Sequence, residues 1–460
     1  MKMNNQALPD NFMWGNSTSS MQTEGAVHEG GKGDSVYANY RSEDGSSVWD
    51  EAIDEYHRYP ADLDLMANQG INCYRFQISW SRVNPMGDGD FNPEGIKFYS
   101  DLIDELLKRK IQPMICLYHF DMPLNLAKKY NGFSSRYVVD AFVRYGKKMI
   151  DLFGDRVKYW ITFNEQNLYF MPGAAKIAGS LKEEETLTDI YTISHHLMLA
   201  HARIAAYLHQ TTDCKIGGML AYSEVYPVSA LPKDVLYARQ LDEFFNKNLL
   251  DAFVFGHYSN EVISFVKNNN LNVDVLPEDL KEISKMKSDY IAFSYYQSAT
   301  ISSSLIPDKT APNYYLQYGG KENPFLQVNE WGWSIDPTGF RDILTKTYNQ
   351  YQLPMFPIEN GIGIRENYHG KEIDDDLRIR YHKEHIQALK DAMYIDGVDI
   401  IGYLVWGLID IPSSSGNMDK RYGMVYVNRT NKEVLDLKRI PKKSYWWFKK
   451  VIQSNGRYLD

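Results

Sequence analysis

The sequence predicts an α/β fold in which eight parallel strands close into a single (β/α)8 barrel, the TIM barrel, with long loops after the strands. Two observations support this: eight short apolar or β-branched runs follow one another, and most precede a helical pattern. The runs lie near residues 11–16, 71–78, 111–117, 157–163, 215–222, 289–296, 354–359 and 400–406. Strand alternating with helix predicts a parallel sheet, and eight such units in 460 residues fit a closed barrel. No linker or low-complexity stretch divides the chain, so we expect one domain over residues 1–460.

Two segments illustrate the predicted helices between these strands. Ile96–Lys110 carries one apolar stripe, and its basic last turn suits the negative end of the helix dipole. The stripe consists of Phe98, Leu102, Ile103, Leu106 and Leu107. Asp374–Met393 is a second helix, opened by three aspartates. Two doubly wound domains are the alternative, but these usually carry a glycine-rich phosphate turn, and Gly31–Ser35 lacks that spacing.

Composition and charge exclude several classes of protein. The 59 acidic residues outnumber the 50 basic ones, and the net charge of −9 argues against a nucleic-acid partner. The first ten residues hold no uninterrupted apolar stretch, and nowhere do 18 apolar residues follow one another, so neither a secretory leader nor a membrane partner is expected. Cys73, Cys116 and Cys214 are odd in number and widely spaced, which predicts reduced, buried thiols and a cytoplasmic protein.

The histidines on the predicted helices do not suggest a metal site. Their spacing in the segment Ile193–Leu208, at residues 195, 196 and 201, puts no pair at i and i+4 on one face. His382 and His385 flank Lys383 and Glu384, and we expect them on a solvated helix face. No metal or organic cofactor is therefore predicted.

Polar and aromatic residues gather at the carboxyl ends of the predicted strands, where a barrel of this kind carries its chemistry. In chain order they are Gln22, Arg75, His119, Asn164 and Glu165, Tyr295 and Tyr296, Glu359 and Asn360, and Trp406. Glu165 and Glu359 each end an apolar strand, where a carboxylate is costly without a partner or a function. A lone glutamate there is most simply a salt-bridged strand terminus. Two of them across one barrel mouth are what glycoside hydrolysis requires, one as proton donor and one as base or nucleophile.

The motifs around these residues resemble family 1 of the glycoside hydrolases, a retaining β-glycosidase family with a (β/α)8 barrel. Residues 162–166 (TFNEQ) and 358–361 (IENG) are similar to its two signatures. The resemblance implies that Glu165 is the acid/base and Glu359 the nucleophile, which Arg75 keeps ionised and Tyr296 orients. It extends over nearly the whole chain, through residues 12–25, 74–82, 117–123 and 289–296. It further implies that the sugar hydroxyls contact Gln22, His119, Asn164 and Trp406. Ser294 stands where the family commonly has Asn.

The loop after Trp406 distinguishes between substrates of the family. Members that act on neutral sugars usually carry Glu seven residues after this Trp, and here that residue is Ser413. A carboxylate there would repel a 6-phosphate, whereas a small hydroxyl leaves room for it and donates a hydrogen bond. Ser413, Lys420 and Tyr422 resemble the triplet with which the family's phospho-β-glycosidases hold phosphate. Taken alone, each feature has a simpler interpretation: residues 413–416 as a plain flexible loop, and Lys420 and Arg421 as a solvated charge pair.

The expected activity is hydrolysis of 6-phospho-β-D-glucosides to glucose 6-phosphate and the aglycone, with retention of configuration. Ser414 is small where phospho-galactosidases tend to carry Trp, which favours the gluco substrate. A neutral β-glucosidase and a 6-phospho-β-galactosidase remain the alternatives within the family. A non-catalytic phosphosugar-binding protein is the alternative outside it, although both glutamates are present. The expected partner is a small phosphorylated β-glycoside; the aglycone and any homo-oligomer are left open.

Overall fold

Eight parallel strands form a closed barrel in the computed structural model, which describes residues 6–40, 47–366, 368–370 and 372–460. The barrel strands are β1 (Met13–Ser17), β2 (Cys73–Gln77), β3 (Gln112–Tyr118), β4 (Tyr159–Phe163), β5 (Lys215–Ala221), β7 (Tyr290–Tyr295), β11 (Met355–Asn360) and β12 (Gly402–Trp406). Around the barrel they follow the order β1-β12-β11-β7-β5-β4-β3-β2. Each of the eight predicted runs overlaps one of these strands, and none of the strand ends departs from its run by more than two residues outward, so the predicted fold is confirmed. Residues 1–5, part of the segment expected to carry no leader, lie outside the described residues.

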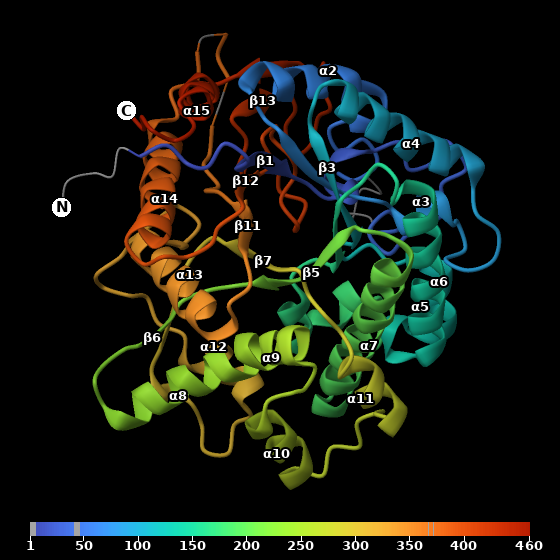
Figure 1. Ribbon diagram of the computed structural model, residues 1–460, viewed down its shortest axis with the longest axis vertical. Helices are drawn as coiled ribbons and strands as arrows, with labels where there is room; N and C mark the ends of the chain where they lie inside the picture. The colour runs from blue at the N-terminus through green and yellow to red at the C-terminus, as the bar shows by residue number, and fades with distance from the viewer. Residues whose placement is uncertain (1–5, 41–46, 367, 371) are drawn as a thin grey trace.

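The helices surround these strands (Figure 1). The longer ones are α2 (Glu55–Gln69), α4 (Pro93–Lys108), α6 (Arg136–Phe153), α7 (Leu187–Thr211), α8 (Pro232–Asp242), α9 (Asn248–Phe255), α10 (Asn260–Asn268), α13 (Pro337–Tyr351), α14 (Asp376–Tyr394) and α15 (Lys443–Gln453). Shorter helices lie in the loops: α1 (Ser20–Thr23), α3 (Trp80–Val83), α5 (Leu124–Tyr130), α11 (Pro277–Ile283) and α12 (Tyr315–Gly319). None of the helices within the described ranges is long and apolar enough to cross a bilayer.

Three two-stranded sheets also lie in the described loops, and the sequence patterns did not predict them. They pair β6 (Val225–Pro227) with β8 (Ala299–Ile301), β9 (Gln327–Val328) with β10 (Ser334–Ile335), and β13 (Val425–Val427) with β14 (Arg439–Pro441). Strands of two or three residues are too short to show a period of two, so their sequences are indistinguishable from loops.

Helix α4 shows how local sequence sets the boundaries of an element. It begins at Pro93, three residues before the predicted start, because the Asn92 side chain accepts the amide hydrogen of Glu94 and proline suits the first turn. Four members of the predicted apolar stripe are buried. Leu107, the fifth, is exposed, so its assignment to the stripe was wrong.

The barrel is filled by side chains from its own strands. The inner cluster consists of Met13, Cys73, Met114, Cys116, Ile161, Met219, Tyr290, Ala292, Phe356, Ile358 and Leu404. A larger apolar layer packs the outside of the strands against the helices. All three cysteines are free and buried, as predicted.

The expectation that His382 and His385 lie on a solvated face was wrong. Both face inward from α14 and are buried. His382 Nδ1 lies 2.8 Å from the Tyr403 hydroxyl, and His385 Nδ1 donates to the Tyr381 carbonyl oxygen at 2.7 Å. Burial lowers the pKa of His385 to about 4, so it is neutral at physiological pH. Residues three apart lie on the same face of a helix, so His382 and His385 can both face inward although the charged Lys383 and Glu384 stand between them in the sequence.

Candidate active site

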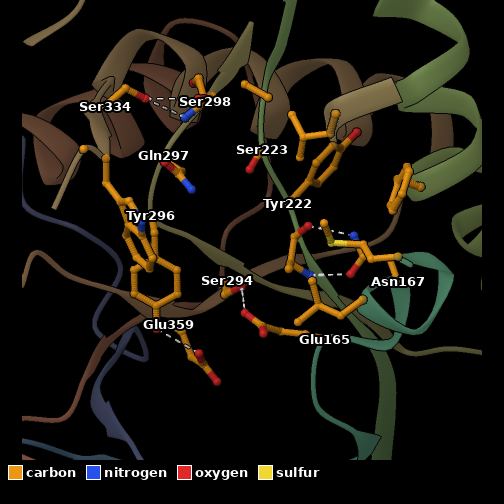
Figure 2. Close-up of a pocket in the computed structure, with 18 of the residues that line it drawn as sticks. Glu165, Asn167, Tyr222, Ser223, Ser294, Tyr296, Gln297, Ser298, Ser334 and Glu359 are labelled. Carbon is orange, nitrogen blue, oxygen red and sulfur yellow. Dashed lines mark hydrogen bonds between the residues drawn. The ribbon is translucent and has the colours of Figure 1, made fainter. Parts of the chain in front are cut away.

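A cavity of about 770 Å³ opens at the carboxyl ends of the barrel strands. All the predicted site residues line it except Arg75 and Asn164; they are Gln22, His119, Glu165, Tyr296, Glu359, Trp406, Ser413, Lys420 and Tyr422. Figure 2 shows Glu165 and Glu359 entering this cavity from different strands, together with Ser294 and Tyr296. The barrel therefore brings together residues that are far apart in the sequence.

Glu359 lies near the end of β11 and is held by two donors. Arg75 Nη1 donates to its Oε1 at 2.7 Å, and the Tyr296 hydroxyl donates to its Oε2 at 2.9 Å. The register between β11 and β7 shifts between Pro357 and Glu359, so Glu359 pairs with Ser294. Such a shift changes the direction of the side chains that follow it. Glu359 is thereby fixed in position and is buried.

Glu165 follows β4 with a left-handed backbone, φ 44° and ψ 57°. This conformation is uncommon for a residue other than glycine, and where it occurs it concentrates at functional sites. Glu165 precedes the short 3-10 turn Gln166–Phe170, and its left-handed backbone turns the carboxyl group into the cavity. Ser294 donates a hydrogen bond to Glu165 Oε1 (Figure 2). An Oε1 occupied by Ser294 leaves Oε2 available to a ligand.

The two carboxyl groups share a desolvated environment, which controls their ionisation. Burial raises the pKa of Glu359; the Arg75 charge opposes this shift and the Glu165 charge adds to it. Burial also raises the pKa of Glu165, against the hydrogen bond from Ser294 and the charge of Arg75. Two carboxyl groups whose charges interact in this way titrate as a pair. With one proton between them, the negative charge is favoured on Glu359, because Arg75 pairs with it directly and Tyr296 also donates to it.

Arg75 and Asn164 lie behind the cavity wall. Both are fully buried, and Arg75 Nη2 donates to Asn164 Oδ1 at 2.6 Å. Arg75 therefore joins Glu359 to the end of β4 through one guanidinium. Within the described residues, Asn164 Nδ2 has no hydrogen-bond partner. The contacts of Arg75 fit a role in orienting Glu359, while a direct contact with sugar by either residue stays a prediction.

His119, Trp406 and Gln22 also line the cavity. The His119 ring stacks on Trp406 with centroids 5.6 Å apart. Burial and the nearby Arg75 charge hold the pKa of His119 well below its usual range, so the ring is neutral. Gln22 Nε2 donates to the Pro412 carbonyl oxygen at 2.7 Å, which ties α1 to the loop after β12. These residues place neutral hydrogen-bonding groups around the space in front of the carboxyl pair.

Lys420 is an unpaired cation in an aromatic environment. Its Nζ lies 3.4 Å from the Trp333 ring centroid and 5.7 Å from that of Tyr422. Among the residues that the structure describes, no carboxylate pairs with it, and burial alone lowers its pKa, to about 8. A partly desolvated ammonium without a counter-ion is suited to an anionic ligand.

Contacts within the loop around Lys420 fix the position of its side chain. Ser413 is buried, and its hydroxyl lies 2.9 Å from that of Ser415. A Cβ atom at Gly363 would lie 2.6 Å from Lys420 Cγ, so glycine gives the lysine stem its space. Arg421 is not the solvated charge of the alternative interpretation, because it is buried and donates to Asp410 Oδ2 at 3.0 Å. Lys420 and Tyr422 thus flank a residue anchored in the interior.

Three residues of the site were not identified from the sequence. Trp333 lies in the β9–β10 hairpin and its ring contacts Lys420 Nζ in the cavity. The available signal was a Trp-Gly-Trp in a polar loop. Gly363 follows the second glutamate motif closely but carries no side chain to suggest a role. Ser294 had been noted only as a departure from Asn, and it contacts Glu165.

A carboxyl pair at the mouth of a (β/α)8 barrel defines a candidate glycoside hydrolase. The chain belongs to glycosyl hydrolase family 1, whose model matches residues 4–457. It is 38% identical to the aryl-phospho-β-D-glucosidase BglA of Bacillus subtilis, over 98% of this chain and 99% of that protein. It is 36% identical to a phospho-cellobiase of Klebsiella oxytoca, over 99% of both chains. A solved family 1 β-glucosidase from Thermotoga maritima superposes with a TM-score of 0.86 and 30% identity over 98% of each chain.

Proposed function

We propose that this protein hydrolyses 6-phospho-β-D-glucosides to glucose 6-phosphate and the aglycone, with retention of configuration. The observation that carries the proposal is Lys420, an unpaired, partly buried cation in the cavity that holds the carboxyl pair. The names of relatives that cover almost the whole chain, an aryl-phospho-β-D-glucosidase and a phospho-cellobiase, support the same substrate class.

In the first step of the proposed reaction, Glu359 attacks the anomeric carbon as a carboxylate. Glu165 gives its proton to the aglycone oxygen as the glycosidic bond breaks, so the aglycone leaves as an alcohol. Arg75 and Tyr296 hold Glu359 in the attacking orientation. The product of this step is a sugar bound covalently to Glu359 in the α configuration.

In the second step, water takes the place of the departed aglycone. Glu165, now ionised, accepts a proton from the water while the oxygen attacks the anomeric carbon and Glu359 leaves. Two inversions give net retention, and both carboxyl groups return to their starting protonation states. These steps require no metal or organic cofactor.

The 6-phosphate is assigned to Lys420, Ser413 and Tyr422. Lys420 supplies charge, while the two hydroxyls can each donate a hydrogen bond. The small Ser414 next to Ser413 supports the gluco over the galacto configuration.

Residues 1–460 are proposed to form one domain, which the family match over residues 4–457 supports. A cytoplasmic location is also proposed. A sugar phosphate is a dianion that does not cross membranes unaided, and the three thiols are free.

The test is to compare hydrolysis of p-nitrophenyl β-D-glucoside, its 6-phosphate and p-nitrophenyl β-D-galactoside 6-phosphate by the purified protein. We expect the highest kcat/KM for the 6-phosphoglucoside. A higher value for the unphosphorylated glucoside would identify a neutral β-glucosidase, and a higher value for the galacto compound a 6-phospho-β-galactosidase.

A further inference from the structure

Ser294 occupies the strand position between the two carboxyl groups. In β7 it pairs in register with Glu359 of β11 on one side and with Ala221 of β5 on the other. Its neighbours Phe293 and Tyr295 both pack on Phe340 of α13, outside the barrel. Alternation along the strand therefore directs Ser294 inward, to the mouth of the barrel.

The Ser294 hydroxyl is committed to Glu165. The residue is 1% exposed, and a hydroxyl that is so buried requires a hydrogen-bond partner. That partner is Glu165 Oε1 (Figure 2). Within the described part of the chain, no other side chain donates to the Glu165 carboxyl group. Ser294 is thus the contact that orients this carboxyl group once the left-handed backbone at residue 165 has turned it inward.

We propose that Ser294 is a positioning residue that selects which oxygen of Glu165 carries the catalytic proton. This rests on the proposed role of Glu165 as acid/base. A carboxylic acid has one O–H, and an Oε1 that accepts from Ser294 is the carbonyl oxygen, so the proton resides on Oε2. In the first step that proton moves from Oε2 to the aglycone oxygen, and in the second Oε2 takes a proton from water. Ser294 donates to Oε1 throughout and exchanges no proton.

The same hydrogen bond acts on the ionisation of Glu165. Burial raises the pKa of this carboxyl group, and the hydrogen bond from Ser294 lowers it, because donation stabilises the carboxylate more than the acid. Loss of the hydroxyl should therefore raise the pKa of Glu165 further. The alkaline limb of kcat/KM, which reports deprotonation of the acid, should move to higher pH.

The experiment compares Ser294→Ala with the donor-retaining Ser294→Asn. For Ser294→Ala we expect the alkaline limb to rise by about one pH unit. We also expect kcat/KM for an alkyl β-glucoside 6-phosphate to fall roughly 10-fold more than for the p-nitrophenyl compound, whose leaving group needs little protonation. Ser294→Asn should recover both properties at least in part. Ser223→Ala removes another hydroxyl that lines the same cavity and should leave the limb in place.

An unmoved alkaline limb in Ser294→Ala, or equal losses on the two aglycones, would overturn the proposal. If Ser294→Ala does not fold, Ser294→Cys makes the same test, because a thiol of similar size is a weak donor. Failure of the proposed function is separately visible in the wild-type protein, as absence of activity on the phosphorylated substrate. Ser294 can then be tested on whichever β-glucoside the wild-type protein hydrolyses.

Discussion

Replacing Lys420 by alanine should remove most of the preference for phosphorylated substrates. Lys420 Nζ has no carboxylate partner among the described residues, so its charge is available to a ligand. A hydrogen bond to a charged group contributes about 1.5–3 kcal/mol, which corresponds to roughly 10- to 150-fold in kcat/KM. The unphosphorylated glucoside makes no such contact and should lose little. The expected result is therefore a change in the ratio of the two activities.

The assay measures kcat/KM for p-nitrophenyl β-D-glucoside and its 6-phosphate in parallel. Lys321→Ala is the matched control, because Lys321 lines the same cavity but lies in the segment between β8 and β9. The control should leave the ratio close to that of the wild-type protein. If Lys420→Ala lowers both activities by the same factor, Lys420 does not recognise phosphate and the assignment of this loop is wrong.

The role of Lys420 can also be tested in the wild-type protein, through the pH dependence of the ratio of kcat/KM for the phosphorylated glucoside to kcat/KM for the unphosphorylated one. Burial lowers the pKa of Lys420 to about 8, so the ammonium is present below that pH and is lost as pH rises through it. The phosphorylated substrate should therefore lose its advantage over the neutral one above about pH 8. A ratio that stays constant up to pH 9 would contradict the assignment.

Four further variants test other parts of the site. Ser413→Glu places a carboxylate against the phosphate dianion, so the preference measured with the same two substrates should fall steeply or invert. Gly363→Ala should displace the Lys420 stem and lower kcat/KM several-fold for the phosphorylated substrate alone, since the new Cβ would lie 2.6 Å from Lys420 Cγ. Tyr296→Phe removes a donor to Glu359, so its pKa should rise further and the acid limb of kcat/KM should move to higher pH. Glu359→Ala should abolish nearly all turnover, and added azide should give an α-glycosyl azide, whereas a β product would refute the nucleophile assignment.

The barrel was predictable because its strands are buried on both faces. Such strands occur in the sequence as short apolar runs rather than alternating patterns, and each of the eight runs overlaps one barrel strand. The carboxyl pair was predictable for a related reason: a glutamate that ends an apolar strand is costly unless it has a partner or a function.

What the sequence did not reveal depends on tertiary contacts. Trp333 contacts Lys420 only because the fold brings the β9–β10 hairpin to the cavity wall, and no local pattern encodes that approach. The inward orientation of His382 and His385 was hidden because both faces of α14 carry polar residues. Ser294 could be recognised as unusual, but its partner could not be identified without the register of β7.

The most direct test of the account is covalent labelling by a slow substrate. A 2-deoxy-2-fluoro-β-D-glucoside 6-phosphate with a good leaving group should form a long-lived glycosyl-enzyme that intact-protein mass spectrometry detects, and peptide mapping should place the label on Glu359. Labelling should be much faster than with the unphosphorylated analogue. Label on another residue would contradict the proposed mechanism, and equal rates for the two analogues would contradict recognition of the phosphate.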